Sequence, residues 1–455
     1  MSIKNNILRV FSANLLTLIS GILIGFVIPA VLSLRGYAYV KTYILYVGYI
    51  GFLHLGFIDG MYIKYGGKSI DEIDKGILKA EHRVFNIIQL IATGIFMVIS
   101  FIKNDFVILL LALSIIPINT STFHKLFYQA TGEFKKFTNI SYIYTLIYLS
   151  ANLSLALIFK SSNYKLYCLS SLIGHIVVLI ILEFKFWRDF KSIKSIYDKT
   201  IWNNIKVGFV ILIANLGIVI FNATDLWFIK LLFNSNEFAY YSFAVSMLNV
   251  INIMIMSISV TFYNYLAREE KEELVKKLKI IFLIIGSFCS LSYFIFSMIV
   301  NIFLEKYISS LSIIAISFAG FPYIIAIKGL FINIYKARKD ERKYLKVMLL
   351  MVVIAILYNL IAVILFKRVE AIAFATLIAF ITWYLYSGYD FKYLNINLKE
   401  LVYLVISTGS FLILSNYLDW FVGGLIYLIL LIISSFIFYK YEILELINFK
   451  KVINE

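Results

Sequence analysis

Ala13-Asn14-Leu15, inside the apolar run Ile7–Leu34, returns later in the chain as Ala214-Asn215-Leu216, at an offset of 201 residues. Two further short stretches recur in the same way: Tyr37-Ala38-Tyr39 as Phe238-Ala239-Tyr240 at an offset of 201, and Tyr128-Gln129-Ala130 as Tyr335-Lys336-Ala337 at an offset of 207. Many transporters build a central site between two duplicated membrane bundles. The repeats therefore predict a duplicated membrane bundle and favour a transporter.

The composition requires a hydrocarbon environment. Of the 455 residues, 62% are hydrophobic and only 15% are charged, with a mean hydropathy of +0.90. Soluble domains carry roughly 25% charged residues. The apolar runs do not alternate in polarity with period 2, which excludes a transmembrane barrel. Cys168 and Cys289 lie in apolar runs, give no disulfide or metal-binding spacing, and are predicted to be inert thiols.

Fourteen apolar windows of about 20 residues are long enough to cross a bilayer. They lie near 9–34, 38–58, 83–102, 105–127, 137–159, 164–184, 205–230, 238–265, 277–300, 307–332, 345–366, 369–389, 399–416 and 419–440. The predicted fold is an all-α polytopic membrane protein with about 14 transmembrane helices: two six-helix lobes in parallel repeat plus two C-terminal helices. The predicted parts are 1–184 for the first lobe, 185–204 for an interfacial cytoplasmic linker, 205–392 for the second lobe and 393–455 for the added helices and tail. Whether both added helices cross the membrane is left open.

Lys and Arg residues set the orientation, because cytoplasmic loops carry an excess of them. With the N-terminus inside, cytoplasmic segments hold 32 of the 42 basic residues and outside loops hold 9. Both termini are therefore predicted to be cytoplasmic, in a multi-pass protein of a bacterial-type cytoplasmic membrane. The net charge of +16 then reflects a basic face toward anionic lipid headgroups, and no nucleic-acid partner is expected.

The stretch Glu183–Lys206 joins the predicted lobes and combines basic with large aromatic and aliphatic residues. Two readings are open. It is an amphipathic helix along the cytoplasmic interface, or an ordinary basic linker.

Catalytic motifs are absent from the sequence, and no enzyme activity, bound cofactor or metal site is predicted. Gly66-Gly67-Lys68-Ser69 resembles the end of a phosphate-binding loop, but position 62 is Tyr where that motif needs Gly. The four histidines, His54, His82, His124 and His175, form no HExxH pair and have no acid expected to converge on them. His54, His124 and His175 are expected to serve as packing or hydrogen-bonding groups between helices.

Polar residues inside the predicted spans are the candidates for binding. Lys328 lies eight residues before Lys336, about 12 Å along a helix from the cytoplasmic interface. It either snorkels to that interface or faces a wet cavity and binds an anion. Gly320, Pro322 and Gly329 predict a kink beside it, and this favours the cavity.

Two neighbouring spans carry polar stripes. Asn215, Asn222 and Asp225 fall on one helix face, as do Asn249 and Asn252 with two serines on the next span. Such stripes either line a cavity or join helices by hydrogen bonds. Two stripes beside an intramembrane acid favour a cavity.

The stretch Pro29–Tyr37, followed by Leu55-Gly56 and Tyr65-Gly66, resembles the start of polysaccharide flippases of the multidrug/oligosaccharidyl-lipid/polysaccharide exporter superfamily. Asp225–Phe233, with Tyr240 and Ala244 after it, is similar to the opening of that family's second bundle. The family usually has a glycine before the tyrosine in both copies; Gly36-Tyr37 keeps it and Ala239-Tyr240 does not.

The resemblance implies two six-helix lobes around a central cavity and transfer of polyprenyl-linked oligosaccharides, for surface polysaccharide synthesis, from the cytoplasmic to the outer leaflet by alternating access. Lys328 and Arg35 would balance the diphosphate of the carrier, and Asn215, Asn222, Asn249 and Asn252 would contact the substrate. Asp225 would couple transport to a proton or sodium gradient. The expected partners are the lipid-linked substrate, the bilayer and other polysaccharide assembly proteins.

Three alternatives remain open. A drug/cation antiporter of the same superfamily would need buried acids, and Asp225 is the one clear intramembrane acid. A membrane polysaccharide polymerase would need a sizeable outside loop, which the short loops do not provide. A flippase for a peptidoglycan precursor is not separated from the main hypothesis by any residue.

Overall fold

A computed structural model describes residues 3–266, 272–338 and 340–452. These residues form helices joined by short connections, and none of them lies in a strand. The chain divides into two compact units, Met1–Ile220 and Phe221–Glu455, so that the boundary falls inside one long helix. The all-α prediction is confirmed.

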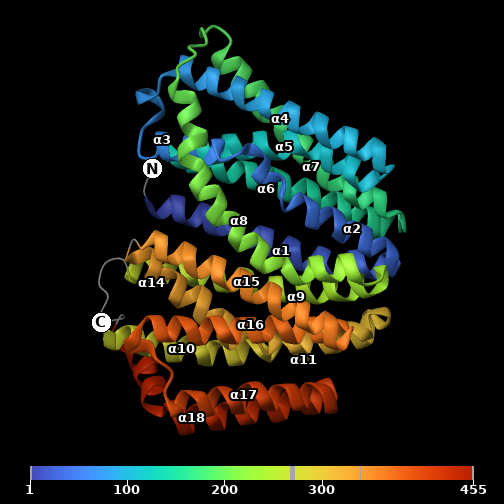
Figure 1. Cartoon of the computed structure of the whole chain (residues 1–455), viewed down its shortest axis with the longest axis vertical. Helices are drawn as coiled ribbons and strands as arrows, with labels where there is room; N and C mark the ends of the chain where they lie inside the picture. The colour runs from blue at the N-terminus through green and yellow to red at the C-terminus, as the bar shows by residue number, and fades with distance from the viewer. Residues whose placement is uncertain (1–2, 267–271, 339, 453–455) are drawn as a thin grey trace. The chain divides into compact units, whose positions relative to one another are not determined.

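The first unit contains seven α-helices, three single turns of tighter or wider helix, and the first part of α8 (Figure 1). The elements are α1 (Ile3–Val31), α2 (Leu34–Val47), η1 (Ile50–His54), α3 (Phe57–Tyr65), η2 (Ile70–Glu72), α4 (Lys75–Lys103), α5 (Phe106–Ala130), α6 (Phe134–Leu153), η3 (Ser154–Ile158), α7 (Tyr164–Phe190) and α8 (Thr200–Leu232).

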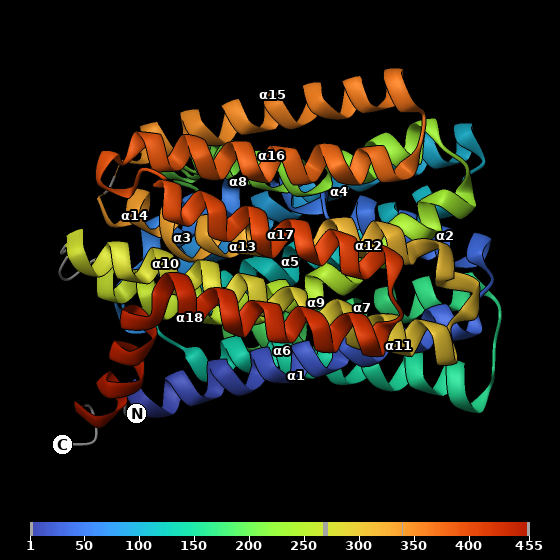
Figure 2. The same cartoon turned by 90° about the horizontal axis from the view of Figure 1, so that it is seen from below.

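The second unit takes the rest of α8 and a further set of helices (Figures 1 and 2). These are α9 (Ser235–Leu266), α10 (Glu272–Ser290), α11 (Ser292–Phe303), η4 (Glu305–Ser310), α12 (Leu311–Phe318), α13 (Phe321–Ala326), η5 (Ile327–Phe331), α14 (Ile332–Ala337), α15 (Glu341–Phe366), α16 (Val369–Asp390), η6 (Lys392–Leu394), α17 (Leu398–Tyr417) and α18 (Trp420–Val452).

Short polar residues start the long helices. Asp74 accepts hydrogen bonds from the N–H groups of Gly76 and Ile77 at the start of α4, and Asp105 caps α5 in the same way. Such side chains satisfy backbone donors that a helix start leaves unpaired. The starting points of these two helices are therefore set by the capping residue just before each of them.

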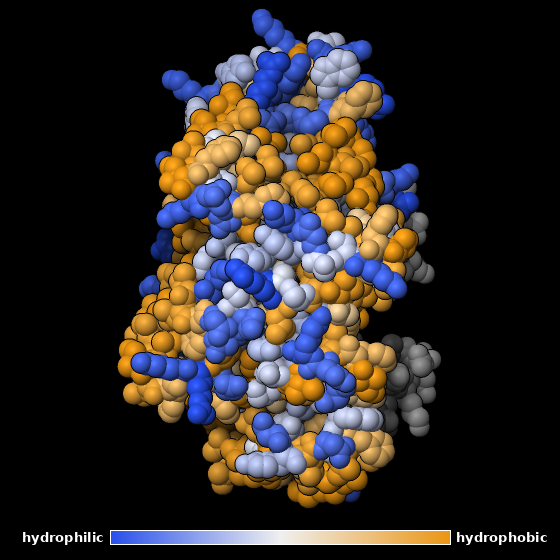
Figure 3. Space-filling view, turned by 90° about the vertical axis from the view of Figure 1, so that its right-hand side faces the viewer, coloured by the Kyte–Doolittle hydropathy of each residue, from blue (hydrophilic) through white to orange (hydrophobic). Residues whose placement is uncertain are grey.

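Eleven helices of the described residues are long and apolar enough to cross a membrane, or up to thirteen when each of two bent pairs counts as one span. The predicted span 238–265 lies in α9, whose side chains beyond Asn252 fall outside the described ones. Large apolar side chains are exposed along many of these helices, and Figure 3 shows how much of one face they cover. The chain is a polytopic membrane protein, since lipid tails would cover such surfaces.

The connection between α7 and α8 corrects one sequence interpretation. It is not one amphipathic helix over Glu183–Lys206: α7 continues to Phe190, residues 191–199 are not helical, and α8 begins at Thr200. The Lys79 ammonium donates hydrogen bonds to the backbone carbonyls of Phe190 and Ile193, at 2.6 and 2.7 Å, and so stabilises the non-helical backbone of this connection. These contacts replace the helical hydrogen bonds that the sequence pattern predicts.

Glycines let α3 approach α8 within the first unit. A Cβ on Gly208 would lie 1.9 Å from the carbonyl oxygen of Gly56, and a Cβ on Gly60 would lie 2.0 Å from that of Asn204. Asn204 also donates to the buried carboxylate of Glu81, at 2.9 Å. Small residues are the usual means by which membrane helices pack closely.

A buried ion pair joins α17 to α10 in the second unit. The Nζ atom of Lys279 lies 2.7 Å from Oε1 and 2.8 Å from Oε2 of Glu400. Both side chains are buried, and Tyr384 on α16 donates a further hydrogen bond to the same carboxylate. The first of the two added helices, α17, is thus tied to the bundle by charge as well as by packing against α10 and α12 (Figure 2).

Candidate functional site

A pocket of about 160 Å3 lies among α8, α9, α16 and the broken helix that includes α12 and η5, all within the second unit. Its lining residues are Phe221, Asn222, Asp225, Leu226, Val245, Leu248, Asn249, Asn252, Ser317, Gly320, Lys328, Ala373, Thr376, Leu377 and Phe380. It combines one lysine, one acid and three amides with an apolar and aromatic wall.

Two polar stripes supply most of its hydrogen-bonding groups. Asn222 and Asp225 come from α8, and Asn249 and Asn252 come from α9, in each case three residues apart. This spacing places both members of a pair on one helix face. Asn222 and Asn249 are exposed, whereas Asp225 is buried. These two amides of the pocket are therefore accessible, and its carboxylate is not.

Asp225 is held by contacts on both carboxylate oxygens. Tyr241 donates to Oδ2 at 2.7 Å, and the backbone N–H of Leu226 donates to Oδ1 at 2.7 Å. Asp225 is 8% exposed and Tyr241 is 1% exposed. Hydrogen bonds of this kind orient a buried carboxylate and offset part of its desolvation cost.

Lys328 lies in η5, a turn of π-helix within a span that bends by 48° between η4–α12 and α13–α14. The predicted kink is therefore confirmed. Pro322 lies in the first turn of α13. A Cβ on Gly286 of α10 would lie 2.4 Å from the Cα of Pro322, so a glycine is required where the bend contacts α10. π-Helical turns are rare and are frequent at functional sites.

The Lys328 ammonium points into the pocket. Its Nζ donates to Oδ1 of Asn252 at 3.4 Å, and the side chain is half-buried. Lys328 thus lines a pocket, as the cavity interpretation expects, and anion binding by it stays a prediction.

Five of the seven residues singled out from the sequence meet in this pocket: Asn222, Asp225, Asn249, Asn252 and Lys328. Asn215 is exposed on the part of α8 that belongs to the first unit, and Arg35 is exposed at the start of α2. Neither lines the pocket. Their roles in substrate binding stay predictions.

Sequence reasoning missed Tyr241, Ser317, Thr376 and two aromatic residues of the wall, Phe221 and Phe380. The rings of Phe221 and Phe380 meet edge to face at 5.3 Å. Ser317 on α12 and Thr376 on α16 have apolar neighbours in the sequence, and no pattern marks them as members of a site. Only the position of Tyr241, sixteen residues after Asp225 on the next helix, could have suggested a partner for the acid.

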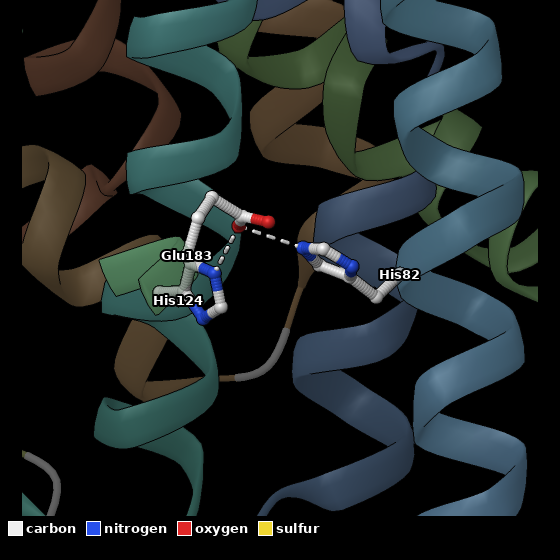
Figure 4. A group of neighbouring side chains, drawn as sticks. All are labelled: His82, His124 and Glu183. Atoms are coloured by element: carbon white, nitrogen blue, oxygen red, sulfur yellow. Dashed lines mark hydrogen bonds and ion pairs between the residues drawn. The ribbon is translucent and has the colours of Figure 1, made fainter. Parts of the chain in front are cut away.

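A second polar cluster lies in the first unit, where α4, α5 and α7 run side by side (Figure 1). His82 Nε2 and His124 Nε2 each lie 2.9 Å from Oε1 of Glu183 (Figure 4). The expectation that no acid converges on the histidines is therefore wrong. Glu183 is 101 residues from His82 and 59 from His124, so only the tertiary packing brings the three together.

Comparison with protein-family models found no match, and comparison with curated proteins found none either. Among solved structures, the chain is similar to the lipid II flippase MurJ in an inward closed conformation, with a TM-score of 0.63 and 15% identity over 96% of this chain and 98% of that one. It is also similar to a multidrug resistance MATE family transporter of the MOP superfamily in an inward-facing conformation, with a TM-score of 0.55 and 12% identity over 84% of this chain and 95% of that one. At these identities the similarity establishes the fold alone, which the chain shares with these two proteins.

Proposed function

We propose that the chain is a flippase that moves polyprenyl-linked oligosaccharide units from the cytoplasmic to the outer leaflet of a bacterial-type cytoplasmic membrane. The units would serve surface polysaccharide synthesis, alongside other assembly proteins, and both termini would be cytoplasmic. Lys328 and the three asparagines that meet in one pocket among apolar helices are the main support. The fold shared with a lipid II flippase agrees with this proposal.

The chemistry of the pocket suits the polar end of a lipid carrier. An unpaired hydroxyl costs roughly 2–7 kcal/mol on entering an apolar medium, so a glycan needs replacement hydrogen bonds to cross. Asn222, Asn249 and Asn252 offer amide donors and acceptors, and Lys328 offers a cation for a diphosphate. The lipid tail can stay in the bilayer.

The volume of the pocket limits what it holds in this conformation. About 160 Å3 accommodates a charged group of diphosphate size, but not an oligosaccharide. The charged group of the carrier is therefore assigned to Lys328, and the sugars would require a more open conformation. Arg35 and Asn215, which lie outside this pocket, would meet the substrate only in such a conformation.

Asp225 is the candidate for coupling transport to a proton or sodium gradient. It is the one acid of the pocket, and its exposed fraction of 8% keeps bulk solvent away from it. A carboxylate beside Thr376 and neighbouring amide oxygens provides the oxygen ligands that sodium takes, and it can equally carry a proton.

The same acid favours a second candidate function, a drug/cation antiporter, and one structural neighbour is a multidrug resistance transporter. An organic cation would be attracted to Asp225 and repelled by Lys328. The lysine in the same pocket favours an anionic substrate over a cationic drug.

Deletion of the gene in its native host tests the proposal. Surface polysaccharide and the leaflet location of the lipid-linked units are measured together. Loss of surface glycan, with intact units trapped on the cytoplasmic side, is the expected result. Single units that accumulate on the outer side would indicate a polymerase, unchanged glycan with altered drug sensitivity would indicate the antiporter, and trapped lipid II would indicate a peptidoglycan substrate.

A further inference from the structure

Three helices of the first unit present one metal-type ligand atom each to a common point. These are Nε2 of His82 on α4, Nε2 of His124 on α5 and a carboxylate oxygen of Glu183 on α7 (Figure 4). All three atoms lie within 4.8 Å of one another. The Nε2 atoms of both imidazoles lie 2.9 Å from the same carboxylate oxygen, Oε1 of Glu183, which accepts hydrogen bonds there.

We propose that this cluster binds one divalent transition-metal ion of the zinc class. Imidazole nitrogen with carboxylate oxygen is a donor set that Zn2+ and its neighbours in the first transition series prefer. Bond lengths near 2.0–2.2 Å around a tetrahedral ion place neighbouring ligand atoms about 3.5 Å apart. The observed spacing fits after side-chain adjustments smaller than one bond length.

The carboxylate gives the site an entrance. The side chain of Glu183 is 35% exposed, whereas those of His82 and His124 are 7% and 2% exposed. Glu183 and His82 line a pocket of about 270 Å3 with Phe186, Trp187 and Phe190. An ion can arrive through this pocket and keep water as a fourth ligand, as zinc does when three protein groups hold it.

Aromatic packing fixes the two imidazole rings. Phe186 lies over the ring of His82 with 4.2 Å between centroids, and Phe123 meets it edge to face at 5.5 Å. His124 contacts Phe186 edge to face at 5.4 Å. Ligands held in this way lose little freedom when an ion binds.

The basic residues of the pocket oppose a dication but do not occupy its place. Lys79, Arg83 and Lys191 line the pocket. The Lys79 ammonium is turned toward the carbonyls at the end of α7, where it donates to Phe190 and Ile193. Their charge predicts weaker binding than at a zinc site without nearby cations, and it allows an anion to accompany the metal.

A bound ion would tie α4, α5 and α7 together near one end of the first unit, independently of the pocket in the second unit. The inference does not depend on the proposed transport function. It assigns the metal a structural or regulatory task in one lobe.

Full-length protein, purified without a polyhistidine tag, is stripped with a chelator and titrated with Co2+ in detergent. The expected result is one Co2+ per chain, with visible absorption bands of low coordination number that added Zn2+ removes. Glu183→Gln and His124→Gln are expected to abolish the bands. His175→Gln is the matched control, because His175 lies on the same helix as Glu183 and stacks on Tyr144 at 4.1 Å, away from the cluster.

Absence of binding to monodisperse wild-type protein would overturn the proposal, as would equal binding by Glu183→Gln. X-ray absorption of the Zn2+ form of the wild type provides a test that needs no variant. Two imidazoles with oxygen ligands are expected, and a spectrum without imidazole would also reject the site.

Discussion

Tyr241 on α9 donates a hydrogen bond to Asp225 on α8, with 2.7 Å between its hydroxyl oxygen and Oδ2. The pair links the two helices that carry the polar stripes, at the most buried side of the pocket. Tyr241 thereby helps to fix the orientation of the Asp225 carboxylate.

Tyr241→Phe should weaken ion coupling more than substrate binding. Loss of a hydrogen bond to a charged group costs about 1.5–3 kcal/mol, which predicts a change of roughly ten- to a hundredfold in the ion concentration needed for half-maximal transport. Transport into proteoliposomes is measured against proton and sodium gradients. Tyr240→Phe is the control, because the neighbouring ring contacts Tyr307 and not Asp225. An unchanged gradient dependence would remove Asp225 from the coupling role.

Lys328→Ala should reduce transport at least tenfold while the protein remains folded, because the pocket loses its only cation among the described lining residues. Lys328→Arg should retain part of the activity, since charge is kept but shape is not. The measurement is export of lipid-linked units by stably inserted protein, with Lys346→Ala on exposed α15 as the charge-matched control. Wild-type export by Lys328→Ala would reject the anion site.

Lys279 and Glu400 should be far more sensitive to single than to paired substitution. Removal of one partner leaves a buried charge and costs about 3–5 kcal/mol, whereas replacement of both by uncharged residues is often close to neutral. Lys279→Met and Glu400→Gln are each expected to lower the thermal unfolding temperature, and the double variant to recover much of the loss. Lys399→Met should change little, because Lys399 is 47% exposed and 3.7 Å from Glu442. A double variant as unstable as the sum of the singles would contradict this.

Gly208→Ala should destabilise the first unit strongly. The added Cβ would lie 1.9 Å from the carbonyl oxygen of Gly56, and neither backbone can move without separating α3 from α8. Gly217→Ala on the same helix meets nothing within 4 Å and should be neutral or slightly stabilising, because alanine favours helix. Thermal unfolding of the two variants in detergent, compared side by side, measures the difference. Equal unfolding temperatures would show that the helices can separate without cost.

Much of the pocket in the second unit was predictable because its polar residues occur in pairs three residues apart in the sequence. Asn222 and Asp225, and Asn249 and Asn252, follow helical periodicity, which projects neighbours onto one face without knowledge of the tertiary structure. Gly320 and Pro322 marked the bend through backbone constraints that are equally local.

What escaped prediction depends on contacts between distant segments. Glu183 reaches two histidines on other helices, and Lys279 reaches Glu400 across 121 residues. The interpretation of Glu183–Lys206 as one helix is wrong for a similar reason. Lys79, more than a hundred residues earlier in the chain, donates a hydrogen bond to the backbone carbonyl of Phe190.

The π-helical turn around Lys328 has a consequence for how this chain is aligned with others and with itself. Such a turn holds one residue more than an α-helical turn, and an α-helix advances by about 100° per residue. The faces of the helix before Ile327 and after Phe331 are therefore rotated relative to each other, compared with an uninterrupted α-helix. An alignment that carries an uninterrupted helix through this stretch would match Lys328 with a residue on a different helix face.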